Sequence, residues 1–478
     1  MSLPTPELWD KLPIAESFWL LLRHVWSPES LDEFYDLHRG RHFQRDIAFS
    51  ELVSVLLEAV TLRQGRAHAV LLNRRDELPA SVQAVYGKIR RMPRELSHAL
   101  LPADAARHRD LLPAELAAPS LGVKGIAGFR HLVFDGHMLK RAAKRLKPVR
   151  GTPGRALGGK LLAVLEVQSD LVVGLHSGAH AHVNEQALLP ELLDQVRATL
   201  PGPRLWIADR AFGTLANFKR CTVGGDQCIL RKTVRSVFQP SGTSAAIHGT
   251  DIKGRAFRDE TGTLCSKREG EQAARQITVE RPGDTPLVIL TSLLDAVEYP
   301  ADDVLELYRQ RWSIERKFRK VGEQFTMGPY CSSTPDGILF HAALCLLLAN
   351  NLTVLQTLMA GEQQRGAQSV STHHLSETLR DELVVCKTLM TTEELVESLR
   401  ARLSLPTAVD WLDYVKSLLG KAWRPKFAKS PAKSRHLPKV KHRRGTAGHF
   451  SIRKVLDEAE GKTTPGKPRS RAKPRKDV

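Results

Sequence analysis

Two short apolar runs near the middle of the chain each lead directly into an aspartate. Residues 132–134 (LVF) precede Asp135, and residues 205–208 (LWIA) precede Asp209. Runs of this length and composition predict buried strands, so each carboxylate is expected to project from the edge of a sheet into a site. Hard divalent cations prefer carboxylate oxygens as ligands. Asp135 and Asp209 are therefore candidates for two of the ligands of such a cation.

A third carboxylate lies on a predicted helix. Residues 304–321 have helical periodicity, and the acidic residues 302–303 are candidates to cap the start of the helix. Tyr308, Arg311 and Glu315 follow at positions i, i+3 and i+7, which places them on one face. Phosphoryl transfer with two metal ions requires about three oxygen ligands from distant parts of a chain, and these acids satisfy that requirement.

The elements predicted around the first two acids come in the order strand, strand, strand, helix, strand. Residues 160–168 and 171–178 are predicted strands on either side of Ser169 and Asp170, and Asn184 is placed to cap the following helix. The strand that leads into Asp209 comes next. This order indicates an α/β fold, but periodicity alone does not choose among the α/β arrangements.

Residues 1–118 have helical periodicity throughout. Ser27, followed by Pro28, and Ser50 are the predicted caps in this region. Two short helices are predicted on either side of a turn within residues 79–101, and the basic residues near this turn are Lys88, Arg90, Arg91 and Arg94. A helix-turn-helix would place them on DNA phosphates or in a major groove, and an ordinary helical hairpin with a solvated basic face fits the pattern equally well.

Between Asp209 and Glu315 lie 105 residues, far more than one strand and one helix require. Residues 221–294 contain strand-like runs and several glycines, which indicates a β-rich insertion. The apolar stretch 338–360 is interrupted by polar residues, so we expect a buried core helix there and no membrane segment. Amphipathic helices are predicted from there to about residue 420.

The net charge of +19 is concentrated at the end of the chain. Residues 421–478 hold 19 Lys or Arg against 4 Asp or Glu, whereas the other 420 residues hold 52 against 48. Such a tail cannot bury enough apolar surface to fold alone, and it is attracted to polyanions. It is therefore either a solvated solubility tail or a segment that contacts nucleic acid.

The six cysteines lack CxxC pairs and lack histidines at zinc-finger spacing. This usage indicates a reducing compartment and argues against structural zinc. The first 11 residues contain acid and proline where a signal peptide has an apolar run. We therefore expect a cytoplasmic protein.

With these residues in place, the chain resembles a DDE transposase of a bacterial insertion sequence, in the insertion-sequence-four family. That family has Tyr, two residues, Arg, three residues, Glu, six residues and Lys around its third acid. Tyr308, Arg311 and Glu315 match this pattern, and Gly322 stands where the Lys is expected. The resemblance spans nearly the whole chain. It implies an α/β fold with a ribonuclease-H-like catalytic core, interrupted by a β-rich insertion, with an all-helical N-terminal domain and a helical, basic C-terminal region.

The resemblance and the shifts in composition divide the chain into six segments. These are a helical N-terminal DNA-binding domain at 1–118, the first part of the core at 119–220, the β-rich insertion at 221–298, the second part of the core at 299–365, a helical C-terminal region at 366–420 and a basic, disordered tail at 421–478.

The resemblance also implies a chemistry. Asp135, Asp209 and Glu315 would be both the catalytic residues and the ligands of two Mg²⁺ ions per active site, with Mn²⁺ as an alternative. The enzyme would bind the ends of its insertion sequence, cleave them by two-metal-ion phosphodiester hydrolysis and join the 3′-hydroxyl ends to target DNA. Its partners would be double-stranded DNA and a second subunit in a synaptic complex, without a membrane, in the bacterial cytoplasm at the nucleoid. A stand-alone metal-dependent DNA nuclease and a non-catalytic DNA-binding protein derived from a transposase are the alternatives.

The residues that match Tyr308 and Arg311 in the family face DNA near the scissile phosphate, although Arg311 and Glu315 also have the spacing of an intrahelical ion pair. In place of the missing Lys, Arg319 is the first candidate for a phosphate contact and Lys320 the second. Arg210, next to Asp209, is a DNA contact or a surface ion pair. The predicted DNA-contacting residues are Tyr308, Arg311, Arg319, Lys320, Arg210, Lys88, Arg90, Arg91 and Arg94.

Histidines and aromatic residues also lie near these motifs. His137 is expected to have a local or DNA-facing role, because the sites of this family use carboxylates. The histidines at 176, 180 and 182 do not have the spacing of one helix face, so no zinc site is predicted there. Some relatives stack a flipped base on a Trp of the insertion. The insertion of this chain has no Trp, and Phe238 and Phe257 are either substitutes or core residues.

Overall fold

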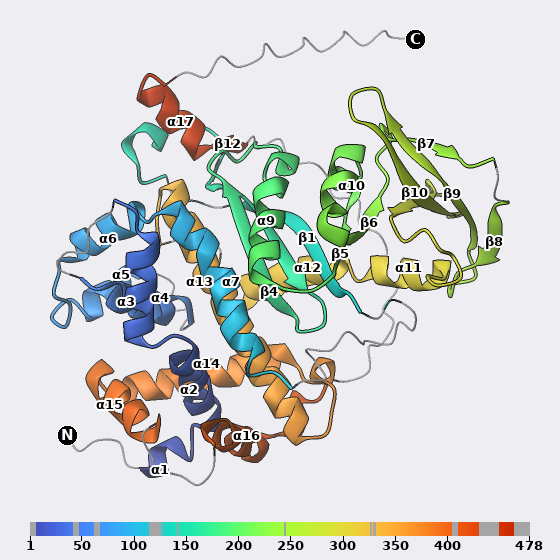
Figure 1. The fold of residues 1–478 in the computed structure, drawn as a ribbon. Helices are drawn as coiled ribbons and strands as arrows, with labels where there is room; N and C mark the ends of the chain where they lie inside the picture. Colours follow the sequence, from blue (N-terminus) through green and yellow to red (C-terminus); the bar gives the residue numbers. More distant parts are fainter. Residues whose placement is uncertain are drawn as a thin grey trace.

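The computed structural model describes residues 6–41, 47–61, 67–113, 126, 128–140, 142, 144–242, 245–325, 327, 331–403, 410–429 and 449–462. Over these residues the protein is a mixed α/β structure. One large mixed sheet has helices packed against it, and further helices gather beyond the end of the sheet that carries β4 (Figure 1).

One half of the sheet has the strand order β4-β3-β1-β5-β6. Strand β3 is antiparallel to its neighbours β1 and β4, whereas β1, β5 and β6 are parallel to one another. Both strands of the predicted hairpin at 160–178 are present, and Asp170 in the turn between them has a left-handed backbone (φ 53°). The bounds are β1 Arg130–Leu139, β3 Gly159–Glu166, β4 Leu171–Gly178, β5 Arg204–Ala208 and β6 Gln227–Arg231.

The predicted β-rich insertion, 221–298, contains β6, which pairs with β5 in the first half of the sheet, and the strands β7 to β11, which build the other half. From β6 the order continues through β11, β10, β9 and β7, and β8 pairs with β9. Strands β7 to β11 therefore continue the same sheet, and the antiparallel pairing of β11 with β6 joins them to it. The bounds are β7 Val237–Pro240, β8 Ile247–Thr250, β9 Ala256–Ser266, β10 Gly270–Val279 and β11 Leu287–Thr291.

Two arginine contacts tie the insertion to helix α11 (Ala301–Arg309): the side chain of Arg275 is buried, and that of Arg309 is partly exposed. Arg275 of β10 forms two hydrogen bonds with Asp259 of β9 (2.8 and 2.5 Å) and donates another to the carbonyl of Tyr299, just before α11 (2.6 Å). At the other end of α11, Arg309 donates to Asp251 beside β8 (3.1 Å). The buried charges of Arg275 and Asp259 need complete pairing, so their contacts fix the start of α11 against the insertion.

The described residues of the N-terminal region, within 6–113, form helices joined by short turns. Ser27 caps α3, with Pro28 in its first turn, which confirms the predicted cap. The cap predicted at Ser50 is wrong, because α4 begins at Phe49 and the Ser50 hydroxyl instead donates to Asp32 (2.7 Å). The bounds are α1 Pro6–Trp9, α2 Pro13–Val25, α3 Pro28–His38, α4 Phe49–Thr61, α5 Ala67–Asn73, α6 Val82–Arg90 and α7 Arg94–Arg109.

Helix α13 (Pro335–Glu362) runs beside α7 across the molecule and contacts the sheet (Figure 1). Among the described residues it is the one helix whose length and apolar composition would suffice for a membrane span. Its apolar window is completely buried inside the protein, which confirms the predicted core helix. Helix α9 (Leu189–Thr199) packs on β3 and β4, and α12 (Trp312–Gln324) packs on β1 and β3.

Helices α14 (Thr372–Leu389), α15 (Thr392–Leu403) and α16 (Trp411–Ala422) pack against α2, so the C-terminal helices complete the N-terminal layer. The tail from 421 was predicted to have no fold of its own, yet its described part includes β12 (His449–Ser451) and α17 (Ile452–Ala459). Strand β12 pairs with β2 (Arg155–Leu157), which supplies the partner that the tail lacks by itself. The rest of the tail, 430–448 and 463–478, lies outside the described residues.

Candidate active site

The two aspartates lie beside each other at the edge between β1 and β5. The parallel pairing of these strands ends at Val133 and Ile207, and Asp135 and Asp209 follow two residues later in each strand direction. Asp209 directly follows β5, as predicted. Asp135 was expected at the end of its strand but lies inside β1, because β3 continues to pair with β1 as far as Leu139. On the side of β5, however, β1 has no strand partner at Asp135, because the pairing of β1 with β5 ends at Val133.

Glu315 lies in the first turn of α12, the helix that packs on β1. The single helix predicted from residue 304 is divided into α11 and α12, with Gln310 and Arg311 between them. Bonds of the i to i+3 kind tighten the backbone here, from the Arg311 amide to the Tyr308 carbonyl (3.1 Å) and from the Ser313 amide to the Gln310 carbonyl (2.8 Å). Arg311, at this junction between the two helices, lies beside Glu315 and Asp135.

Arg311 lies among the three predicted catalytic acids. Its Nη1 donates to Glu315 Oε1 (2.6 Å) and lies 3.9 Å from Asp135 Oδ2, and the side chain is only 7% exposed. Burial alone would lower the pKa of Arg311, but the hydrogen bond to Glu315 and the nearby charge of Asp209 raise it. The predicted intrahelical ion pair with Glu315 is therefore present. The positive charge of the Arg311 guanidinium lies between the carboxylates.

These surroundings change the pKa of Asp135. Burial raises its pKa to about 6. The Gly136 amide, which donates to Oδ1 (2.8 Å), and Arg311 both lower this pKa, whereas Glu315 and Glu185 raise it. A carboxylate that is buried beside two other acids is stabilised in its charged form when a cation is bound.

Asp209 and Tyr308 complete this part of the site. Asp209 Oδ1 lies 3.9 Å from Arg231 Nη1, and this buried oxygen accepts no hydrogen bond from the described residues. Tyr308 is buried, which raises its pKa to about 12; the charge of Arg311 lowers this pKa and that of Asp209 raises it. An all-carboxylate donor set, with a buried oxygen that accepts no hydrogen bond from the described residues, fits a hard divalent cation. The structure brings the three acids around one guanidinium, but their oxygens do not share one group within 4.8 Å.

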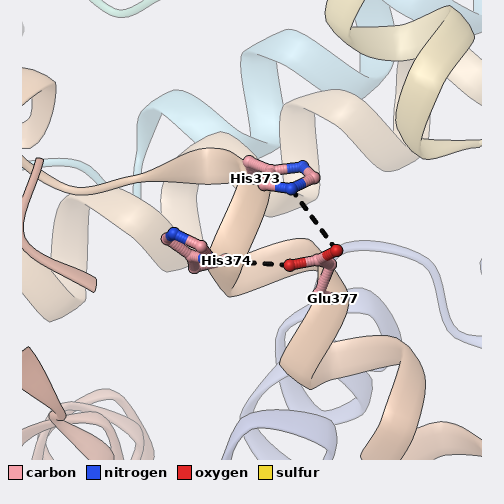
Figure 2. A group of neighbouring side chains, drawn as sticks. All are labelled: His373, His374 and Glu377. Carbon is pink, nitrogen blue, oxygen red and sulfur yellow. Dashed lines mark ion pairs between the residues drawn. The ribbon is translucent and has the colours of Figure 1, made fainter. Parts of the chain in front are cut away.

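Within the described chain, such a group of potential metal ligands occurs elsewhere, at the start of α14. His373 Nε2 lies 3.3 Å from Glu377 Oε1, and His374 Nδ1 lies 3.4 Å from Glu377 Oε2 (Figure 2). All three side chains are largely open to solvent, and no contact joins them to the acids of β1 and β5. This cluster therefore belongs to the surface of the C-terminal layer.

The basic residues predicted at the α6–α7 turn have different surroundings. Lys88 donates to the Ile47 carbonyl (2.7 Å), and Arg94 donates twice to Asp336 at the start of α13 (2.9 and 2.7 Å). Arg90 and Arg91 are exposed. Lys88 and Arg94 therefore connect elements within the protein, and Arg90 and Arg91 are the members of the set best placed for an external partner.

The predicted DNA-contacting residues near the acids differ in how far their side chains are exposed. Arg319 on α12 and Arg210 after β5 are exposed. Lys320 is half buried on the side of α12 that carries Lys317. At Gly322 a Cβ atom would meet nothing within 4 Å, so the position of the missing Lys is open. Their roles in DNA binding stay predictions.

The histidines considered in the sequence lie apart from one another. The His137 ring stacks on Phe318 of α12 (centroids 4.7 Å apart), and burial lowers its pKa to about 4. His176 lies against His98 of α7 (4.3 Å), whereas His180 pairs with Asp457 of α17 (3.3 Å). His137 therefore holds α12 on β1. His176 and His180 therefore have separate partners, on α7 and on α17.

Sequence reasoning missed three residues of this region: Glu185, Arg231 and Trp312. Trp312, next to Arg311, is 52% exposed, and the Arg311 guanidinium lies 4.5 Å from the centre of its ring. An exposed Trp is unusual, but its exposure cannot be read from the sequence. Arg231 and Glu185 are distant in sequence from the residues they approach, so no local spacing marks them.

Comparison with known proteins gives an independent result. Residues 127–351, just under half of the chain, match the family model of the transposase DDE domain. No curated protein matches the chain. Among solved structures, a cryo-EM structure of the piggyBac transposase synaptic complex with hairpin DNA is similar at 11% identity, with a TM-score of 0.35, over 86% of this chain and 76% of that one. The match to the family model supports a DDE transposase, an enzyme class that generally uses divalent metal ions.

Proposed function

We propose that this chain is a transposase that binds the ends of an insertion sequence, cleaves them and joins their 3′-hydroxyl ends to target DNA. One observation carries the proposal above all others. Asp135, Asp209 and Glu315, from a strand, a strand end and a helix, gather around the Arg311 guanidinium within the region that matches the transposase DDE domain.

A ribonuclease-H-like core, of the insertion-sequence-four kind, is part of this proposal. It is supported by the strand order β4-β3-β1-β5-β6 with β3 as the antiparallel member, and by the helix α9 that connects β4 to β5. In such a core the first acid is on the central strand, and Asp135 is on β1. The insertion then lies between the second and third acids, which is where β7 to β11 are found.

Asp135, Asp209 and Glu315 would hold two Mg²⁺ or Mn²⁺ ions, which would supply an activated hydroxyl and stabilise the leaving oxygen of the phosphodiester. Two side chains near the acids have proposed roles of their own. Arg311 carries a planar fork of donors suited to a phosphate, and it is held ready beside Glu315 (2.6 Å). Tyr308 is buried close enough to Arg311 and Asp209 for their charges to act on its hydroxyl group, and it is proposed to face the DNA strand beside Arg311.

Double-stranded DNA, both transposon ends and target, is the proposed partner, and two ends held together require at least a dimer. The exposed Arg90, Arg91, Arg210 and Arg319 and the basic tail are the proposed electrostatic contacts. A bacterial protein that acts on genomic DNA would lie in the cytoplasm, at the nucleoid.

The test is a cleavage and joining assay with purified protein, Mg²⁺ or Mn²⁺, and DNA that contains the inverted repeats flanking the gene. The wild-type chain should cut at the repeat ends and join the 3′ ends to a second duplex. Asp135→Asn, Asp209→Asn and Glu315→Gln should each abolish both steps while DNA binding persists. If Asp135→Asn left cleavage and joining intact, the assignment of the active site would be wrong.

The same assay separates the alternatives. A stand-alone nuclease would hydrolyse DNA but produce no joined product. A non-catalytic DNA-binding protein derived from a transposase would bind the repeats and do neither.

A further inference from the structure

Two histidines and a glutamate come together at the start of α14, on the surface of the C-terminal layer (Figure 2). His373 Nε2 lies 3.3 Å from Glu377 Oε1, and His374 Nδ1 lies 3.4 Å from Glu377 Oε2. The ligand atoms that the three residues offer all lie within 4.8 Å of one another. The helix itself makes this arrangement, because residues three and four positions apart are neighbours on a helix surface.

The distances in this cluster agree with the coordination of a small divalent ion. Around a tetrahedral Zn²⁺ with bonds of about 2.0–2.1 Å, two ligand atoms are about 3.3–3.4 Å apart. The two nitrogen-to-oxygen distances from the imidazole rings to the Glu377 carboxylate are 3.3 and 3.4 Å. The side chains therefore already have the spacing that such an ion requires.

The backbone that carries these side chains is held by contacts from other parts of the chain. Ser371 caps α14 by accepting a hydrogen bond from the His374 amide (3.4 Å), and its own amide donates to the Phe427 carbonyl (2.7 Å). Gln324, at the end of α12, donates to the Thr372 carbonyl (3.2 Å). A backbone that is fixed in this way lowers the entropy cost of holding the ligands together around an ion.

We infer that His373, His374 and Glu377 form a binding site for a divalent transition-metal ion of the Zn²⁺ class. Mg²⁺ and Ca²⁺ prefer oxygen ligands alone, whereas two imidazole nitrogens and one carboxylate suit Zn²⁺. Three protein ligands leave a fourth coordination position for water. The site is separate from the acids proposed to hold Mg²⁺ or Mn²⁺, and the inference does not depend on the proposed function.

The same contacts would be present if Glu377 only formed surface ion pairs with the two histidines. Glu377→His distinguishes these roles, because it removes the carboxylate of both ion pairs but supplies a third imidazole as a ligand. Glu377→Gln removes the ion pairs and the ligand together. A metal site therefore predicts that Glu377→His binds Zn²⁺ and that Glu377→Gln binds it weakly.

Zn²⁺ binding to the full chain, first freed of metal with a chelator, is measured by competition with a chromophoric zinc indicator. His373→Gln, His374→Gln and Glu377→Gln should each raise the Kd by at least about tenfold, since even residues behind a metal ligand change affinity by that factor. Glu377→His should bind Zn²⁺ at least as tightly as the wild type. His248→Gln, at an exposed histidine of β8, is the matched control and should leave the Kd unchanged.

Two results of this titration would overturn the inference. One is an unchanged Kd in His373→Gln, His374→Gln and Glu377→Gln. The other is an equal loss of affinity in Glu377→His and Glu377→Gln, which would show that the carboxylate acts only through its ion pairs. The side chains of His373, His374 and Glu377 are 71%, 47% and 48% exposed, so their substitution should not disturb folding.

Zn²⁺ also binds carboxylates, so Asp135→Asn identifies the place of binding. Zn²⁺ should raise the melting temperature of the wild type and of Asp135→Asn, because a ligand that binds the folded state stabilises it, but it should not raise that of His373→Gln. If Zn²⁺ stabilises His373→Gln and fails to stabilise Asp135→Asn, the ion binds at the acids and the site on α14 is refuted.

Discussion

Lys317, two residues after Glu315, fastens α12 to the sheet through a buried ion pair. Its side chain is 5% exposed, and Nζ donates to the Asp170 carbonyl (2.7 Å), to Asp170 Oδ2 (3.1 Å) and to Thr353 Oγ1 of α13 (2.7 Å). Burial lowers the pKa of Lys317, and Asp170 opposes that effect. The Asp170 side chain is 45% exposed, so the two partners of the pair are buried to very different extents.

This asymmetry predicts unequal costs for breaking the pair from its two ends. Asp170→Asn leaves a buried ammonium without a counter-charge, and we expect a loss of about 2 kcal/mol in the free energy of unfolding, below the ~3–5 typical of fully buried pairs. Lys317→Met removes the buried charge itself. Asp170 is then solvated, and Thr353 still donates to the Ala349 carbonyl (2.8 Å), so the expected change is within about 1 kcal/mol.

Urea unfolding followed by Trp fluorescence measures both variants, provided that the slopes of the transitions agree. Asn tolerates the left-handed backbone of residue 170 (φ 53°), so the substitution adds no strain of its own. Arg316→Met, at an exposed position of the same helix, is the control. The double variant should be no less stable than Lys317→Met alone. Equal losses in Asp170→Asn and Lys317→Met would refute the reasoning.

Three other predictions follow from single positions. Burial raises the pKa of Glu382, which accepts hydrogen bonds from the start of α2, to about 7. Because this value is above the ordinary 4.5, the contribution of Glu382 to stability is complete below pH 4.5 and is lost as the pH rises through 7. Glu382→Gln should therefore reduce the pH dependence of the unfolding free energy between about pH 5 and 8 by up to ~3 kcal/mol, measured by urea unfolding at each pH. Gly322→Ala should stabilise α12 by about 1 kcal/mol, and Gly322→Lys should in addition tighten binding to transposon-end DNA; equal DNA affinities of the two variants would exclude a phosphate contact at this position. Arg319→Ala should weaken binding of the same DNA and flatten its dependence on salt, and unchanged binding in a salt titration would remove Arg319 from the site.

The strands and helices around the acids could be predicted because each has a local signal. The hairpin at 160–178 and the buried α13 are both present. The division between α11 and α12 was not predicted, because periodicity does not register a local tightening from i+4 to i+3 hydrogen bonds. The pairing of the insertion with β6 was also not predictable, since a strand pattern does not name its partner.

The residues of the candidate site also fall into those that could be predicted from the sequence and those that could not. Asp135, Asp209 and Glu315 were found because apolar runs and helical spacing mark them in the sequence. The sequence by itself therefore determined which acids are brought to the sheet edge and which helix faces them. Only the tertiary structure decided that Arg311 stands among these acids and that Glu185 is seated against Gly136. Such contacts join helices and strands that are distant in the sequence. The packing of the whole core, rather than any local sequence pattern, determines where these elements meet.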